Sequence, residues 1–367
     1  MNEDRPVRVA VVGGAGTWGR FYLRAYADHP GCEVIALVDR ARARRQAFAD
    51  RYGVPATFDD LEELLRREVP EVVSAILPVA QSHPAVLACA EAGVRVVSIE
   101  KPIAAQLSKA DEMIRVCRER GTALGCGTSH WQLPYQGEVA DWVRQGGIGA
   151  LTGAAIPGGL PTEVSGGGCA NLIVLGHVTG MEVEWAEGWT LPPVGSYASP
   201  EAEAPHEVDC PAYGRLGLSG GIVCEIAEPE PDRTVPCTVS VTGEGGRAFL
   251  ASPRPVLLQG TGARESPVFP DFLDGCPRKD AFTLVIERLL KAAREGGEVA
   301  CSGRDYLHVL EAALAMTLSA ARNHERVHLP LEDRALRLFP HPYRMYGGDV
   351  AGWRSIGYQG PPGLPDA

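Results

Sequence analysis

The sequence lacks the features that mark membrane, secreted and nucleic-acid-binding proteins. No apolar run approaches the ~18 residues that a helix needs to cross a bilayer. The first six residues carry two acids and no apolar stretch of the kind found in a secretory signal. Lys and Arg total 35 against 46 for Asp and Glu, so the formal charge is −11, and the positive excess that binding to nucleic acid or anionic lipid requires is missing. We therefore expect a cytoplasmic protein with neither nucleic acid nor membrane as a partner.

Patterns typical of metal sites and disulfide frameworks are also missing. The ten cysteines include no C-x-x-C pair, and no Cys/His cluster has zinc spacing. His324 and His328 have i, i+4 spacing, but Pro330 and the strand-like residues 327–329 argue against a helix that would present them together. We expect buried thiols in a reducing compartment, and no metal site.

The 367 residues are enough for two or three domains. Over residues 1–126, β-branched runs alternate with helical segments. The expected strands are 7–12, 33–38, 72–77, 95–99 and 122–125. Near-continuous apolar strands separated by helices predict a parallel sheet covered on both faces. We therefore expect a doubly wound α/β domain of the Rossmann type over residues 1–126.

The composition and the pattern of the sequence change near residue 127. Residues 150–260 are rich in Gly, Pro and Thr, with strands expected at 217–226 and 238–242, and helices return at 282–293 and 307–318. This order predicts an α+β domain over residues 127–335 with a large, mostly antiparallel open sheet. Because such a sheet needs its open face covered, we expect a homodimer or homotetramer. Residues 336–367 hold many aromatics and predict an ordered arm, packed on the body or on a neighbouring subunit.

The strongest motif follows the first expected strand. Gly14, Gly16 and Gly19 satisfy G-x-G-x-x-G, and Asp39 lies 20 residues after Gly19, at the end of the second strand. Gly14 would permit the tight turn, Gly16 would let backbone approach a pyrophosphate, and Gly19 would let helix pack on strand. A following helix offers free N–H groups to the phosphates. The spacing predicts a dinucleotide site.

The same region favours NAD slightly over NADP. Asp39 would accept hydrogen bonds from the adenosine ribose, as NAD requires, whereas Arg40 would hold a 2′-phosphate or stack on adenine. Thr17 lies in the glycine loop and is expected to bind the cofactor. Trp18, beside it, would cover the cofactor or pack on the second domain.

A charged pair follows the expected strand 95–99. Glu100 and Lys101 precede Pro102, so they lie at the carboxyl edge of the sheet, where ligands bind. From the residues alone, Lys101 is either an exposed lysine or a catalytic one.

The motifs together resemble the glucose–fructose oxidoreductase and inositol dehydrogenase family (Gfo/Idh/MocA). Beyond G-x-G-x-x-G and E-K-P, the matching segments are 129–134, 146–149, 238–246 and 281–330. The resemblance covers most of the chain. It implies hydride transfer between a nicotinamide and an alcohol or ketone on a sugar or cyclitol, with Lys101 beside nicotinamide and substrate.

The resemblance also implies a catalytic histidine, and here the chain departs from the family pattern. A glycine run at 166–168 leads to His177, but the acid expected four positions earlier is Ile173, and Asn171 is the nearest polar residue. His177 would act alone as proton donor or acceptor, or it is a packing histidine. His130 and Asn171 are candidate substrate residues. Pro78 and His83 would shape the nicotinamide ribose pocket.

Two other functions stay open. The altered signature permits an NAD(P)H-dependent imine reductase, in which His177 or Lys101 supplies the proton. It also permits a non-catalytic sensor that binds a dinucleotide and reports it to a partner.

Overall fold

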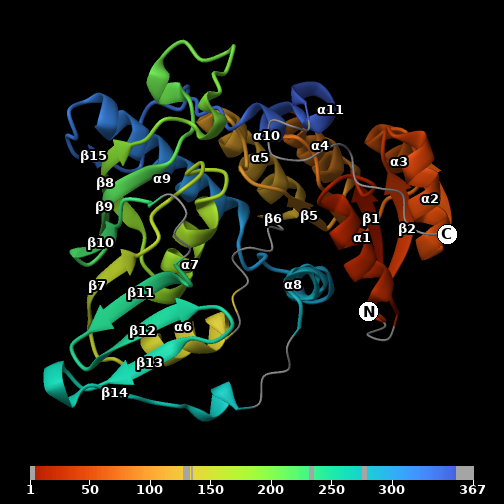
Figure 1. Cartoon of the computed structure of the whole chain (residues 1–367). Coiled ribbons are helices and arrows are strands. Elements are labelled where there is room, and N and C mark those ends of the chain that lie inside the picture. The colour runs from red at the N-terminus through yellow and green to blue at the C-terminus, as the bar shows by residue number, and fades with distance from the viewer. Residues whose placement is uncertain (1–4, 127–132, 134, 231–234, 275–278, 353–367) are drawn as a thin grey trace. The chain divides into compact units, whose positions relative to one another are not determined.

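The computed structural model describes residues 5–126, 133, 135–230, 235–274 and 279–352 (Figure 1). The chain forms two compact units. The first takes the described residues within Met1–Ser129, Asp280–Leu307 and Pro342–Ala367, and the second takes those within His130–Lys279 and His308–His341.

A parallel sheet of six strands, in the order β3-β2-β1-β4-β5-β6, forms the centre of the first unit. The strands are β1 (Val7–Val12), β2 (Cys32–Val38), β3 (Ala56–Phe58), β4 (Val72–Ala75), β5 (Val96–Ile99) and β6 (Ala123–Cys126). The helices are α1 (Gly19–Asp28), α2 (Arg42–Tyr52), α3 (Leu61–Arg67), α4 (Val79–Ala92), α5 (Leu107–Arg120), α8 (Ala281–Glu295), α10 (Pro342–Tyr346) and α11 (Gly348–Ala351). The order reverses between β1 and β4, which is where such sheets bind ligands.

The predicted Rossmann domain is confirmed, and β3 is the strand that the sequence reading missed. It has three residues on the edge of the sheet, too few to show an apolar pattern. Central strands such as β4 and β5 are buried along their whole length, as their Val- and Ile-rich sequences require.

Each unit is made of separate segments of the chain, whereas the predicted domains were continuous, with boundaries after residues 126 and 335. Helix α8 falls inside the predicted second domain, yet its buried residues Val285 and Ile286 share one core with Val9 of β1 and Tyr22 of α1. The ring of Phe282 stacks on Phe21 with centroids 5.2 Å apart. The apolar face of α8 is buried against α1, so this helix belongs to the first unit although it follows the second in sequence.

The second unit contains an open sheet of nine strands, in the order β14-β13-β12-β11-β7-β10-β9-β8-β15. The strands are β7 (Leu151–Ile156), β8 (Val183–Thr190), β9 (Ala212–Leu218), β10 (Ile222–Ile226), β11 (Cys237–Gly243), β12 (Gly246–Ala251), β13 (Val256–Gln259), β14 (Ser266–Pro267) and β15 (Val327–His328). Neighbouring strands are antiparallel, with β7 and β10 paired in parallel. The predicted mostly antiparallel open sheet is therefore confirmed.

Helices α6 (Gln136–Arg144) and α7 (Cys169–Thr179) pack on the half of this sheet that holds β7, β11 and β12. Helix α9 (Gly303–Ala321) supplies its residues from His308 onward to this unit. The predicted strand 217–226 is in fact two strands. Gly220 and Gly221, with φ of +84° and +80°, turn the chain back between β9 and β10.

The described residues were also compared with the requirements of membrane helices, metal sites and disulfides. The helices of this part of the chain are all too short or too polar to cross a membrane. The same residues contain no group of three or more His, Cys, Asp or Glu that would hold a metal ion. The nine cysteines that the structure describes are free thiols, and burial raises the pKa of Cys89 and Cys224 to about 12.

The close packing of the β1–α1 turn gives a first prediction. A methyl group on Gly19 would lie 2.0 Å from the carbonyl oxygen of Gly13, and backbone cannot move aside as a flexible side chain does. We expect Gly19→Ala to lower the free energy of unfolding by about 2 kcal/mol or more, measured by urea unfolding followed by circular dichroism.

Gly137→Ala in α6 is the matched control. Apart from its two chain neighbours and the backbone of its own helix, no described heavy atom lies within 4 Å of the added methyl group, and alanine favours a helix by ~1 kcal/mol over glycine. Equal stability of the two variants would contradict the steric argument.

Candidate functional site: a cavity at the switch point of the parallel sheet

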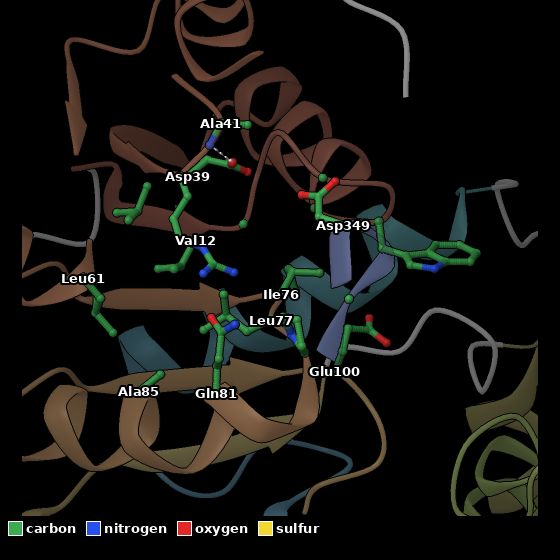
Figure 2. A pocket seen from close by; sticks show the side chains of 18 of the residues that line it. Val12, Asp39, Ala41, Leu61, Ile76, Leu77, Gln81, Ala85, Glu100 and Asp349 are labelled. Carbon is green, nitrogen blue, oxygen red and sulfur yellow. Dashed lines mark hydrogen bonds between the residues drawn. The ribbon is translucent and has the colours of Figure 1, made fainter. Parts of the chain in front are cut away.

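A cavity of about 620 Å³ opens in the first unit at the carboxyl ends of its central strands. Val12 ends β1, Asp39 follows β2, Ile76 follows β4 and Glu100 follows β5, and all four line the cavity (Figure 2). Parallel strands bring their carboxyl ends to one edge, so residues distant in sequence meet there.

The glycine loop forms one side of the cavity, with roles that differ in part from the predicted ones. Gly13, with φ of +73°, makes the turn that was assigned to Gly14. Gly14 packs behind the loop, where a methyl group would lie 2.5 Å from Leu37 Cδ1. Gly16 and Gly19 line the cavity as expected of the motif, and Gly16 N–H donates to Gly13 O at 3.0 Å.

Asp39 is held in place by two backbone donors from different elements. Its Oδ2 accepts from Ala15 N–H of the glycine loop at 3.2 Å, and its Oδ1 accepts from Ala41 N–H at 2.8 Å, the dashed line of Figure 2. A carboxylate can accept further bonds on its remaining lone pairs. Asp39 is thus positioned to receive ribose hydroxyls. Arg40, next to it, lines the cavity with an exposed side chain.

Other predicted cofactor residues divide into two groups. Thr17, Trp18, Pro78 and Glu100 line the cavity. His83 of α4 instead places Nε2 2.8 Å from Glu112 Oε2 of α5. The positions of α4 that line the cavity are 81, 84, 85 and 88. This i, i+3, i+4, i+7 spacing is one helix face, and position 83 lies on another.

A buried lysine lies at the edge of the cavity. Lys101 is 7% exposed, its Nζ lies 3.3 Å from Glu100 Oε2, and the same atom lies 5.4 Å from the ring centroid of Trp18. Tyr22 of α1 donates its hydroxyl hydrogen to Glu100 Oε1 at 2.6 Å. Burial, with the charge of Glu100 beside it, raises the pKa of Tyr22 well above its usual value, so the hydroxyl keeps its proton. The sequence reading missed Tyr22, whose only signal is its place on the apolar face of α1.

The second unit holds the other predicted residues. His177 of α7 is half-buried, and Gln136 Nε2 lies 3.1 Å from its Nδ1. Since an amide NH₂ group only donates, Nδ1 accepts and the proton of the neutral ring is on Nε2. Asn171 donates to Gly159 O at 3.3 Å, which ties the start of α7 to a turn. Ile173, where the resemblance implies an acid, is buried. His130 lies outside the described residues.

Cavity residues carry polar atoms that lack partners among the described residues. Thr17 Oγ1, Arg44 Nε and Tyr346 Oη are buried and make no hydrogen bond there, and all three residues line the cavity. Buried polar atoms without partners are costly, so they suit a polar ligand. The cavity, the helix N-terminus of α1 and the carboxylate of Asp39 together fit a dinucleotide.

A separate buried acidic pair lies in the second unit and gave no sequence signal. Asp209 is fully buried and accepts from Val164 N–H at 2.9 Å and from Ser165 N–H at 3.0 Å. Glu163, also buried, accepts from His341 N–H. Burial, reinforced by the charge of Glu163, raises the pKa of Asp209 to about 7. These carboxylates hold the loop before the glycine run 166–168 and the segment near residue 341.

The parallel sheet, the glycine turn and the cavity define a dinucleotide-binding protein of the Rossmann class. Residues 7–128 match the family model described as "Oxidoreductase family, NAD-binding Rossmann fold". This is the family model of the Gfo/Idh/MocA oxidoreductases, so the resemblance seen in the sequence is confirmed over these residues.

Similar proteins include sugar-processing enzymes. The chain is 29% identical over 174 residues to D-glucoside 3-dehydrogenase of Escherichia coli (strain K12), covering 44% of this chain and 49% of that protein. It is 31% identical over 160 residues to dTDP-3,4-didehydro-2,6-dideoxy-alpha-D-glucose 3-reductase of Streptomyces antibioticus, covering 44% and 48%. The matches thus span about half the length of these relatives.

Solved structures show the same fold over nearly the whole chain. The WlbA dehydrogenase from Bordetella pertussis, crystallised with NADH and UDP-GlcNAcA, has a TM-score of 0.70 at 18% identity, and the similarity covers 90% of this chain and 100% of that one.

The buried acidic pair leads to a prediction on pH. Because the folded state holds the proton of Asp209 up to about pH 7, whereas an unfolded aspartate loses it near 3.8, this group makes the protein less stable as pH rises between those values. We expect the contribution to fall by about 3 kcal/mol across that range. Asp209→Asn removes the titration, so the free energy of unfolding of the variant depends less on pH.

The measurement is urea unfolding at intervals from pH 4 to pH 8, compared between the natural chain and the variant. Asp141→Asn, at an exposed carboxylate of α6, is the control. Parallel pH profiles for the natural chain and Asp209→Asn would contradict the assigned titration.

Proposed function

We propose that the protein is an NAD(P)-dependent oxidoreductase that transfers hydride between nicotinamide and a sugar- or cyclitol-like alcohol or ketone. The observation that carries this proposal is the buried Lys101 at the edge of a dinucleotide-sized cavity. The activities of the two relatives named above, a D-glucoside 3-dehydrogenase and a dTDP-sugar 3-reductase, support the substrate class. We further propose NAD over NADP, a cytoplasmic location, and a homodimer or homotetramer formed through the open sheet.

The residues of the cavity would hold the cofactor by backbone and carboxylate contacts. Gly16 and Thr17 precede α1, whose first N–H groups would receive the phosphates. Asp39 would accept from the ribose hydroxyls. When bound, the nicotinamide supplies the carbon that gives or takes the hydride, and the protein supplies placement.

Lys101 has the properties of an electrophilic group. Its ammonium is removed from water, so a hydrogen bond from Nζ to a substrate oxygen would be stronger than in solution. Glu100 balances its charge, and Tyr22 fixes one oxygen of Glu100, so the ammonium is held in one place. We propose that Lys101 stabilises the oxygen that gains negative charge as the carbonyl is reduced.

His177 is the candidate proton donor or acceptor of the second unit. The hydrogen bond from Gln136 to Nδ1 orients the ring and places the proton of the neutral ring on Nε2. Ile173 supplies no carboxylate, and the amide of Gln136 is a partner of this histidine.

The test is turnover of the purified protein with NAD⁺, NADP⁺ and their reduced forms against a panel of sugars, cyclitols and imines, followed by the absorbance of reduced nicotinamide. We expect Lys101→Ala to lower kcat by roughly 10²- to 10³-fold because a preorganised donor is lost. The Kd for the cofactor should change less than about threefold.

Lys109→Ala, an exposed lysine of α5, is the matched control and should leave kcat unchanged. Unaltered turnover in Lys101→Ala would exclude the role given to this lysine. Tight cofactor binding without turnover of any substrate would instead favour the sensor, and turnover of imines alone would favour the imine reductase.

A further inference from the structure

The C-terminal segment of the described chain, Pro342–Gly352, is part of the dinucleotide cavity. This segment includes α10 and α11 and belongs to the first unit. The residues that line the cavity are Tyr343, Arg344, Tyr346, Gly347, Gly348 and Asp349. Sequence reasoning predicted an ordered arm without assigning it a role.

Packing holds this segment against the first unit. Helix α10 contacts α4, as Figure 1 shows, and the bend between α10 and α11 lies on Pro78. Gly347 has φ of +85°, and a methyl group there would lie 3.1 Å from Pro78 Cγ. The segment therefore forms a wall of the cavity and not a loose tail.

Asp349 lies near the guanidinium of Arg44, which also lines the cavity. Its Oδ2 lies 3.8 Å from Arg44 Nη2 of α2. The Arg44 side chain is 17% exposed and that of Asp349 is 70% exposed. Figure 2 shows Asp349 and Asp39 among the side chains that surround the cavity.

The position of Arg44 makes this pair relevant to cofactor choice. Arg44 lies five residues after Asp39 and lines the same end of the cavity. The neighbouring Arg45 is already paired with Asp59 and with the backbone oxygen of Asp39. Arg44 is thus in a position to bind a phosphate on the ribose, but the carboxylate of Asp349 already lies beside its guanidinium.

Acids outnumber bases among the charged residues that line the cavity. Six acids line it, namely Asp39, Asp59, Asp60, Glu62, Glu100 and Asp349, against the four bases Arg40, Arg44, Lys101 and Arg344. A 2′-phosphate brings up to two further negative charges, which these carboxylates repel unless an arginine is available.

We propose that Asp349 is a cofactor-specificity residue, which by pairing with Arg44 withholds that guanidinium from a 2′-phosphate and so favours NAD(H) over NADP(H). This inference rests on the proposed function, because it assumes that the cavity holds a nicotinamide dinucleotide. It extends that function by assigning the selection to the C-terminal segment as well as to Asp39.

The test measures binding of NAD⁺ and NADP⁺ to the purified full chain by isothermal titration calorimetry. We expect Asp349→Asn to tighten NADP⁺ binding roughly fivefold and to change NAD⁺ binding less than about twofold, since the pair is partly exposed. The gain should shrink as salt is raised. Asp50→Asn, at an exposed acid of α2 outside the cavity lining, is the control and should leave both affinities unchanged.

A double variant distinguishes the effect of the Arg44–Asp349 pair from the general repulsion between the carboxylates and a 2′-phosphate. In the Arg44→Gln background, Asp349→Asn should no longer tighten NADP⁺ binding, because the guanidinium that it releases is absent. A gain that persists there, an unchanged ratio of the two affinities in Asp349→Asn, or a natural chain that prefers NADP⁺ would overturn the inference. Failure of the natural chain to bind either nucleotide would overturn the proposed function itself.

Discussion

The site depends on one steric constraint, the close approach of α1 to the turn that follows β1. Gly19 lies where a methyl group would meet the oxygen of Gly13, and Gly14 lies where one would meet Leu37. These contacts bring the start of α1 to the carboxyl end of β1. Backbone N–H groups and the helix dipole then point into the cavity, which suits an anion without any basic side chain. A chain of net charge −11 can therefore bind a dinucleotide.

The arrangement of charged groups at the edge of the cavity depends on that packing. Tyr22 is on the buried face of the same helix and donates to Glu100, and Glu100 in turn pairs with Lys101. The helix that is proposed to receive the phosphates thus also orients the proposed electrophile. A buried ion pair of this kind contributes little to stability, and its benefit is a fixed geometry.

The second unit places an amide beside its candidate histidine. Gln136 Nε2 lies 3.1 Å from His177 Nδ1, while Ile173, where the resemblance implies an acid, is buried. Two buried carboxylates of this unit, Asp209 and Glu163, bind backbone N–H groups of the loop before α7 and of residue 341. They support the loop and the segment leading to the C-terminal wall, so their role here is structural.

Local patterns in the sequence determined most of the helices and strands of the first unit and the chemistry that its motifs can perform. The apolar strands, the glycine spacing and the E-K-P pair are readable because each is a contiguous run with its own physical requirement. Tertiary structure alone decided which separated segments meet. It turned His83 toward Glu112, placed α8 in the first unit and brought Asp349 to Arg44. Such contacts join residues as far as 305 positions apart in number, and periodicity carries no information on them. The sequence therefore determined that a dinucleotide loop exists, and the fold decided which distant side chains complete its cavity.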